Sequence, residues 1–290
     1  MNLTKDKKIL IVGLGLIGGS YAQALSAKGY EVGAIDLDCD AIDYALKKGY
    51  IRHGKSMVEQ EYVGSFDVLI FALYPHVFVD WVEKYQSFFK SGAIITDVTG
   101  AKGAVVFKVQ NVLRSDVEFI SAHPMAGREV SGVQNAKAEI FDGANYIVVP
   151  TNKNTPDGIE LCKQLGKELG FKKVSELSVE EHDEMVGFLS HLTHCIAVSL
   201  MVCKPSSHLA EYTGDSFRDL TRIAKINDEL WSELFLANKD EIVKQMELFE
   251  EQFGKLKQYV QHEDRDAIRQ MLRLSTQRRK VFDKCNDEEN

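Results

Sequence analysis

The chain has 290 residues, of which 44% are hydrophobic and 27% are charged, with a formal net charge of -8 at pH 7. These proportions are typical of a soluble globular protein and exclude a disordered chain. The acidic balance, without a dense lysine and arginine tract, argues against nucleic acid and anionic membrane surfaces as partners.

The first half of the chain alternates short apolar runs with helical segments. The apolar runs predict strands over 8–13, 30–36, 66–73, 93–98 and 117–122. The segments between and after them predict helices over 17–28, 39–49, 76–89 and 101–113. Two more strand-like runs, 144–150 and 171–177, enclose a helix that begins at Pro156 and ends at Gly170. Strands separated by helices predict an α/β domain with a parallel sheet.

The pattern changes after Leu177. Ser178, followed three residues later by Glu181, forms a capping box that predicts the start of a long helix reaching about Cys203. This helix is apolar nearly all round, so we expect other helices or a second subunit to surround it. Further helices are expected to begin near Phe217, Asp228, Lys239 and Glu263. We therefore expect an α/β domain over 1–177 and an all-helical domain over 178–290.

The cysteines and the apolar runs indicate where the protein works. The five cysteines are scattered and include no Cys-x-x-Cys pair, which argues against a disulfide framework and against a zinc site. We expect no run of the roughly 18 apolar residues needed to span a bilayer, and no signal peptide. The expected location is therefore the cytoplasm.

A glycine-rich turn follows the first predicted strand. Gly13, Gly15 and Gly18 have the spacing G-x-G-x-x-G. The first glycine permits a tight turn, the second lets a pyrophosphate approach, and the third lets the helix pack on the strand. Leu16 and Ile17 begin that helix, whose unpaired N–H groups can bind phosphate. Between a strand and a helix, this pattern predicts a Rossmann-type dinucleotide site rather than a purely structural turn.

Asp36 indicates which dinucleotide is bound. It lies at the end of the second predicted strand, roughly 20 residues after the glycines, where a carboxylate accepts hydrogen bonds from the ribose hydroxyls. A carboxylate there repels a 2'-phosphate, and no arginine stands beside it in the sequence. We therefore expect NAD rather than NADP.

Histidines supply the candidates for proton transfer. His123 lies at the carboxyl end of the fifth predicted strand, where open α/β sheets place their ligand crevice. Its position alone fits a strand-end residue bound to the backbone and a catalytic residue equally well. His191 and His194 share one face of the long helix, so they are either core residues or line a cavity. With no acidic or cysteine partner at zinc spacing, we expect no metal. His182 is expected to be solvated.

Arg222 is the candidate for binding a carboxylate. It stands in a short segment that also contains acidic residues. A salt bridge with one of these acids is one interpretation. The other is a guanidinium group that binds a substrate carboxylate through two hydrogen bonds.

Four runs of the sequence together resemble the prephenate dehydrogenase family. They are GLGLIGGS, FISAHPMAGREVSGV, HDEMVGFLSHLTH and FRDLTRIA…LWSELF, in an order that covers nearly the whole chain. The two histidine-containing runs are more specific than the glycine run, which many dehydrogenases share. The resemblance implies NAD(P)-dependent oxidative decarboxylation of prephenate to 4-hydroxyphenylpyruvate, the precursor of tyrosine. It also implies a homodimer formed through the helical domain.

The resemblance gives each candidate residue a role. His123 matches the residue that accepts the proton of the substrate's ring hydroxyl as hydride leaves for nicotinamide, a task that suits a neutral imidazole. Arg222 matches an arginine that binds a substrate carboxylate. The other matched positions at or near the substrate are Ser190, His191, His194 and Trp231.

The chain departs from the family pattern at two positions. Gly100 stands where a serine is common, and Thr99 before it is a candidate to supply a hydroxyl to the substrate or to His123. Arg128 stands where a threonine is common. Three alternatives stay open: the arogenate-specific enzyme of the same family, a β-hydroxyacid dehydrogenase, and a non-catalytic NAD-binding protein. For the second of these we find no matching lysine motif in the helical half.

Overall fold

The structure is a computed structural model that describes residues 2–128, 130–205 and 208–282. The chain forms two compact units, Met1–Lys239 and Asp240–Asn290. The first unit contains both sheets and the helices up to Lys239, and the second contains most of one long helix and the helix that follows it.

The first unit is built on a six-stranded parallel sheet of order β3-β2-β1-β4-β5-β6. The strands are β1 (Lys8–Val12), β2 (Glu31–Ile35), β3 (His53–Lys55), β4 (Val68–Phe71), β5 (Ile94–Asp97) and β6 (Glu118–Phe119). The helices are α1 (Leu16–Ala27), α2 (Cys39–Lys48), α3 (Gln60–Val63), α4 (Pro75–Tyr85) and α5 (Val106–Val112). The predicted α/β domain with a parallel sheet is therefore confirmed.

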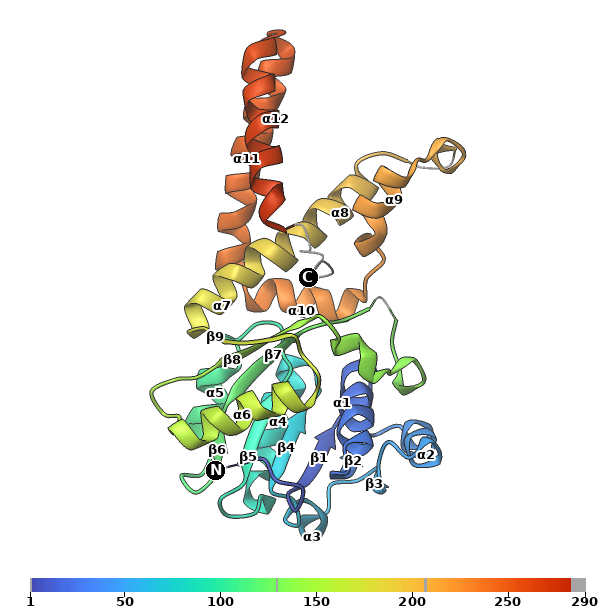
Figure 1. Ribbon diagram of the computed structural model, residues 1–290, viewed down its shortest axis with the longest axis vertical. Coiled ribbons are helices and arrows are strands. Elements are labelled where there is room, and N and C mark those ends of the chain that lie inside the picture. The colour runs from blue at the N-terminus through green and yellow to red at the C-terminus, as the bar shows by residue number, and fades with distance from the viewer. Residues whose placement is uncertain (1, 129, 206–207, 283–290) are drawn as a thin grey trace, which may run out of the picture. The chain divides into compact units, whose positions relative to one another are not determined.

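Both faces of this sheet are covered. Successive residues of β1 belong to different cores, with Ile9 and Ile11 in one and Leu10 and Val12 in the other, because side chains alternate across a strand. Helices α1 and α2 contribute to the first core and α3, α4 and α5 to the second (Figure 1). Strands buried on both faces read as continuous apolar runs, which explains why the sequence revealed β1 and β4. It did not reveal β3, whose three residues His-Gly-Lys are not apolar.

The fifth predicted strand divides between two sheets, so the prediction of one parallel strand over 117–122 is wrong. Strand β6 ends at Phe119, and the chain continues as β7 (Ser121–Met125). Strand β7 pairs antiparallel with β8 (Asn145–Val149), which pairs parallel with β9 (Lys173–Glu176). His123 therefore lies in the middle of an edge strand of the second sheet rather than at the carboxyl end of a parallel strand. An apolar run carries no signal for a change of partner strand.

Helix α6 (Pro156–Glu168) connects β8 and β9. The remaining α-helices of the first unit follow β9. They are α7 (Val179–Val186), a π-helical segment (Gly187–Leu192), α8 (Thr193–Val202), α9 (Asp215–Thr221) and α10 (Asp228–Ala237). The predicted capping box is confirmed, because the Ser178 side chain accepts from the backbone N–H of Glu181 and the Glu181 carboxylate accepts from that of Ser178.

The continuous helix Val179–Val202 is less buried than expected. Only 33% of its most apolar 18-residue window is buried within this chain. By length and composition it is also apolar enough to cross a membrane, so the expectation that no run reaches this length is wrong. The core or interface helix of a soluble protein has the same composition.

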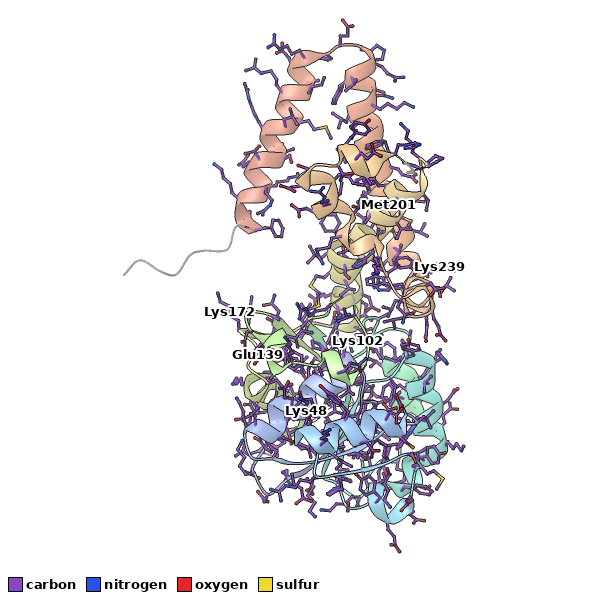
Figure 2. The ribbon with its side chains drawn as sticks, turned by 90° about the vertical axis from the view of Figure 1, so that its right-hand side faces the viewer. Lys48, Lys102, Glu139, Lys172, Met201 and Lys239 are labelled. Atoms are coloured by element: carbon purple, nitrogen blue, oxygen red, sulfur yellow. The ribbon has the colours of Figure 1, made fainter. Side chains whose placement is uncertain are left out.

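The described part of the second unit, up to Phe282, contains two α-helices and a 3₁₀ turn, Lys280–Phe282. Helix α11 (Lys239–Gln261) and α12 (Arg265–Arg279) run in opposite directions and are joined by a short turn (Figure 2). The turn contains Glu263, which adopts a φ of 55°. These bounds agree with the helices predicted from about Lys239 and Glu263.

Candidate active site

The glycine-rich turn has the geometry that a dinucleotide site requires. Gly13 has a φ of +97°, and a Cβ there would lie 2.4 Å from the carbonyl oxygen of Ala72. A Cβ on Gly18 would lie 1.9 Å from the carbonyl oxygen of Gly13. By contrast, a Cβ on Gly15 would meet no atom within 4 Å. Gly13 and Gly18 are thus required by the protein's own packing, whereas Gly15 borders open space, as the second glycine of a dinucleotide-binding turn must.

Asp36 is held against the same turn. It follows β2, its Oδ2 accepts a hydrogen bond from the backbone N–H of Leu14 at 2.5 Å, and its Oδ1 accepts from that of Asp38 at 2.8 Å. Helix α1 begins at Leu16, and no side chain caps its N-terminus. Cofactor phosphates can therefore bind the first-turn N–H groups, which include that of Ile17, and the carboxylate of Asp36 lies where a ribose hydroxyl can donate to it.

Two substitutions separate folding from cofactor binding at this turn. Gly18→Ala is expected to lower the melting temperature and to weaken NAD binding, because its Cβ would overlap the Gly13 carbonyl. Gly15→Ala is expected to keep the melting temperature and still weaken NAD at least about tenfold, or roughly 1.4 kcal/mol. Thermal unfolding and calorimetric titration measure the two effects. Wild-type NAD affinity in Gly15→Ala would contradict this placement of the pyrophosphate.

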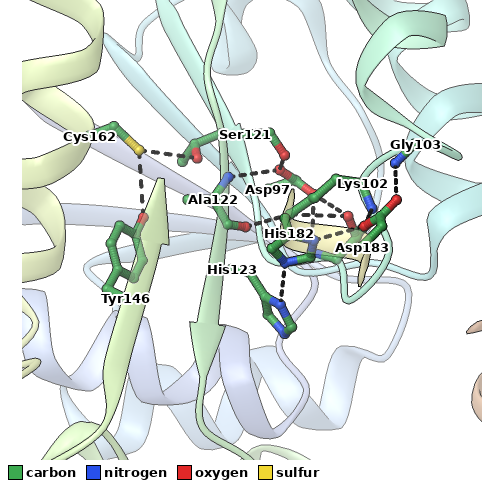
Figure 3. A network of polar contacts seen from close by, with 12 residues as sticks. Asp97, Lys102, Gly103, Ser121, Ala122, His123, Tyr146, Cys162, His182 and Asp183 are labelled. Atoms are coloured by element: carbon green, nitrogen blue, oxygen red, sulfur yellow. Dashed lines mark hydrogen bonds and ion pairs between the residues drawn. The ribbon is translucent and has the colours of Figure 1, made fainter. Parts of the chain in front are cut away.

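A line of two histidines and one carboxylate is the centre of the candidate active site (Figure 3). The Nδ1 atom of His123 lies 2.8 Å from Nε2 of His182, and Nδ1 of His182 lies 2.8 Å from Oδ1 of Asp183. The carboxylate of Asp183 also accepts from the backbone N–H of Lys102 at 2.8 Å and of Gly103 at 2.7 Å. His123 on β7 and His182 on α7 are 59 residues apart in sequence, so two distant elements combine to orient His123.

The expectation that His182 is solvated is wrong. Its side chain has 0% exposure, because the first turn of α7 packs with this residue directed toward β7. The acidic residues Glu180 and Glu181 of the same turn indicated a surface position. One signal was present in the sequence, since His182 and Asp183 begin the specific run HDEMVGFLSHLTH.

Hydrogen bonding along this line determines which nitrogen of His123 carries the proton. Burial acts to raise the pKa of Asp183, but the hydrogen bonds from His182, Lys102 and Gly103 lower it overall, so the carboxylate is ionised. An ionised carboxylate only accepts, so Nδ1 of His182 donates to it and Nε2 of His182 accepts. The Nδ1–H of His123 must then donate to that Nε2. The lone pair of His123 therefore resides on Nε2.

Both histidines of this line are neutral near pH 7. Burial, followed by the positive charges that His182, Lys102 and His191 can carry, lowers the pKa of His123 well below 6.5. Burial also lowers the pKa of His182, although its hydrogen bond to Asp183 opposes this effect. A neutral His123 with a lone pair on Nε2 has the protonation state that a general base requires.

Thr99 and Gly100 precede Lys102 and His123 in the sequence, and Thr99 was the candidate to supply a hydroxyl to the substrate or to His123. The hydroxyl of Thr99 donates to the Asp97 carboxylate, and Thr99 is only 4% exposed. Its proton is therefore committed to Asp97. A Cβ on Gly100 would lie 3.9 Å from Cε1 of His123 and 3.3 Å from a side-chain carbon of Leu234. A side chain at position 100 would therefore press against Leu234 and reach van der Waals contact with His123.

The histidines of the long helix differ in their surroundings. His191 is 1% exposed, its Nδ1 lies 3.3 Å from the amide nitrogen of Asn238, and burial lowers its pKa to about 4. His194 is half-buried, stacks on Trp231 with ring centroids 3.6 Å apart, and donates from Nδ1 to the carbonyl of Ser190 at 2.8 Å. The π-helical segment carries Ser190 and His191, and such segments are frequent at functional sites. His191 is a core residue, and His194 is the more accessible of the two.

The two candidate arginines are exposed. Arg222 lies on the 3₁₀ turn Arg222–Ala224, which packs beside α8, the helix that carries His194. Arg128 follows β7 by three residues. Among the described residues, no three His, Cys, Asp or Glu side chains gather as a metal site would require.

Comparison with protein families and curated relatives gives a consistent result. The family model for the prephenate dehydrogenase nucleotide-binding domain matches residues 21–175, and that for the prephenate dehydrogenase dimerization domain matches residues 178–274. A prephenate dehydrogenase from Bacillus subtilis is 34% identical, covering 92% of this chain and 74% of the relative. One from Lactococcus lactis is 31% identical, covering 90% and 73%.

Solved structures give the same picture. A prephenate dehydrogenase from A. aeolicus, in complex with hydroxyphenyl propionate and NAD+, has a TM-score of 0.88 at 29% identity, covering 98% of this chain and 100% of the other. An arogenate dehydrogenase from Synechocystis has a TM-score of 0.81, covering 95% and 99%. At 21% identity, this second likeness concerns the fold alone.

Proposed function

The chain belongs to the prephenate dehydrogenase family, and we propose that it converts prephenate to 4-hydroxyphenylpyruvate by an NAD-dependent oxidative decarboxylation. The observation that carries the proposal is the line from Asp183 through His182 to His123, which leaves a neutral imidazole with its lone pair on Nε2. Oxidation of a ring alcohol requires such a base.

His123 acts on the ring hydroxyl of the substrate. NAD, when bound at the glycine turn, supplies the acceptor for the hydride that leaves the carbinol carbon. As this C–H bond breaks, Nε2 of His123 takes the hydroxyl proton and the C–O bond becomes a carbonyl. The ring carboxylate then leaves as carbon dioxide, and its electron pair makes the ring aromatic and the oxygen a phenolate. The imidazolium returns the proton to that oxygen, so His123 ends in its starting state.

The other candidates bind the substrate in this proposal. His194 and Trp231 contact it from the helical domain, together with Ser190, while His191 supports them from the core. Arg222 binds a carboxylate. Thr99 does not contact the substrate in this proposal, because its hydroxyl donates a hydrogen bond to the Asp97 carboxylate.

Rates with the two candidate substrates test the proposal. Purified enzyme with NAD is given prephenate or arogenate, and NADH formation is followed by absorbance. Prephenate is expected to be used with the higher kcat/KM. Preference for arogenate would establish the other enzyme of the family, and no turnover with either substrate would refute the proposed reaction.

Arg222→Gln is expected to raise the KM for prephenate about 10- to 100-fold with little change in kcat. A charged hydrogen bond contributes roughly 1.5–3 kcal/mol, and carboxylate binding is shared by the ground state and the transition state. Arg222→Lys keeps the charge but loses the planar pair of donors, so an intermediate KM is expected. Steady-state kinetics measure both. An unchanged KM in Arg222→Gln would assign Arg222 to a salt bridge only.

We further propose that the protein is a cytoplasmic homodimer that associates through its helical domain. The matching family model over residues 178–274 describes a dimerization domain. A second copy would cover the apolar surface of the helix Val179–Val202, which is mostly unburied within one chain. Light scattering of the purified protein tests the oligomeric state.

A further inference from the structure

A buried ion pair lies close to the proposed base. Asp97, at the end of β5, and Lys102, in the loop before α5, both have 0% exposed side chains, and Lys102 Nζ lies 2.9 Å from Asp97 Oδ2. Burying two charges is unfavourable unless further hydrogen bonds satisfy them, and a buried pair is weak evidence for a stabilising role. The partners of this pair indicate a different role.

Both charges bind the peptide groups of Ala122, the residue before His123. Asp97 Oδ1 accepts from the backbone N–H of Ala122 at 3.2 Å and from the hydroxyl of Ser121 at 2.6 Å. Lys102 Nζ donates to the carbonyl oxygen of Ala122 at 2.6 Å. Because β7 is an edge strand, these outward backbone groups have no neighbouring strand to pair with. The ion pair supplies the hydrogen-bond partners that a neighbouring strand would otherwise provide.

The backbone of Lys102 also binds Asp183, the carboxylate at the end of the histidine line opposite His123. Its backbone N–H donates to Asp183 Oδ1 at 2.8 Å, and that same oxygen accepts from His182. One residue thus fixes the strand that carries His123 through its side chain and the carboxylate that orients His182 through its backbone (Figure 3).

We propose that the Asp97–Lys102 ion pair is a positioning device, which holds the His123 ring at hydrogen-bonding distance from His182 and in register with the substrate hydroxyl. Neither residue contacts substrate, and both act through the backbone of β7. This inference rests on the proposed role of His123 as the base. A misplacement of about 1 Å at a reacting group can lower a rate by around 100-fold.

A set of three variants separates positioning from stability. Lys102→Met or Asp97→Asn alone leaves one buried charge without its partner, so a strongly lowered melting temperature is expected. The double variant D97N/K102M removes both charges and is expected to regain most of the wild-type melting temperature. It does not regain the charged hydrogen bonds to the backbone of Ala122, so its kcat with prephenate is expected to stay about 100-fold below wild type. The KM and the NAD affinity are expected to change little.

The pKa of His123 provides a second readout, which an NMR titration measures without turnover. Lys102 is one of the positive charges that lower the pKa of His123, together with those of His182 and His191. In the double variant, an NMR titration of the His123 ring is therefore expected to give a higher pKa, and the acid limb of kcat/KM moves to higher pH. Lys90→Met, which removes a surface ion pair with Asp67, is the matched control and is expected to change neither quantity.

The outcomes separate this inference from the proposed function. If the double variant regains wild-type kcat together with its melting temperature, and the pKa of His123 is unchanged, the ion pair is only structural and the inference is overturned. If wild-type enzyme turns over neither prephenate nor arogenate, the proposed function fails. In that case the NMR titration still tests whether the ion pair controls His123.

Discussion

Replacing His123 with asparagine is expected to lower kcat with prephenate by about 10²- to 10⁴-fold, which is the usual contribution of a general base. The asparagine amide can still donate to Nε2 of His182, so the loss of the Nε2 lone pair is the main change. The dissociation constant for NAD is expected to remain nearly that of wild type, because the glycine turn and Asp36, which are the proposed NAD ligands, are unchanged in this variant. Steady-state rates and calorimetric titration give the two values.

The pH dependence provides the control for this variant. The base must be neutral, so kcat/KM is at its plateau above the pKa of His123 and falls as the pH drops through it. Burial, then the neighbouring positive groups, lowers this pKa well below 6.5. Wild type is therefore expected to hold its plateau at pH 6.5, with an acid limb below it, and His123→Asn is expected to lack that limb. A variant with nearly wild-type kcat and the same acid limb would show that His123 has only a structural role.

Features formed by neighbouring residues could be predicted from the sequence. The glycine turn requires Gly18 because of its contact with the Gly13 carbonyl within one strand-turn-helix unit, and the capping box spans only Ser178 to Glu181. Such features have a fixed spacing, so a single sequence reveals them. The resemblance to a family supplied the substrate, which no local pattern contains.

Features that depend on contacts distant in sequence could not be predicted. His182 was expected to be solvated, yet it bonds to a residue 59 positions away. Lys102 stands in the run AKGAVV, where nothing indicates that Asp97 and the Ala122 carbonyl will surround its ammonium group. His191 and His194 were expected to share a face, but only the structure shows that one is in the core and the other stacks on Trp231.

These distant contacts also explain why His123 could not be assigned from its position. The prediction placed it at the carboxyl end of a parallel strand, and the structure places it within β7 of a second sheet. Its chemistry follows from the residues around it rather than from the strand end. The tautomer is determined by His182 and Asp183 on α7, so a histidine that was expected to be solvated orients the ring of His123.

Replacing His182 with leucine tests this dependence directly. Leucine cannot accept the Nδ1–H of His123, so that tautomer loses its partner and the ring is free to carry its proton on Nε2 instead. In serine proteases, the wrong tautomer of the catalytic histidine lowers kcat by about 10⁴-fold. We expect His182→Leu to lower kcat with prephenate roughly 100-fold or more, with NAD affinity unchanged.

His182→Gln separates the lost acceptor from the lost side chain. The glutamine Oε1 can occupy the place of Nε2 and accept from His123, so its kcat is expected to lie within about tenfold of wild type. Melting temperatures of both variants show whether each is folded under the assay conditions. Equal losses of kcat in folded leucine and glutamine variants would mean that His182 acts by packing. A larger loss in leucine alone requires an acceptor at this position, because acceptance from Nδ1–H is what distinguishes the two side chains.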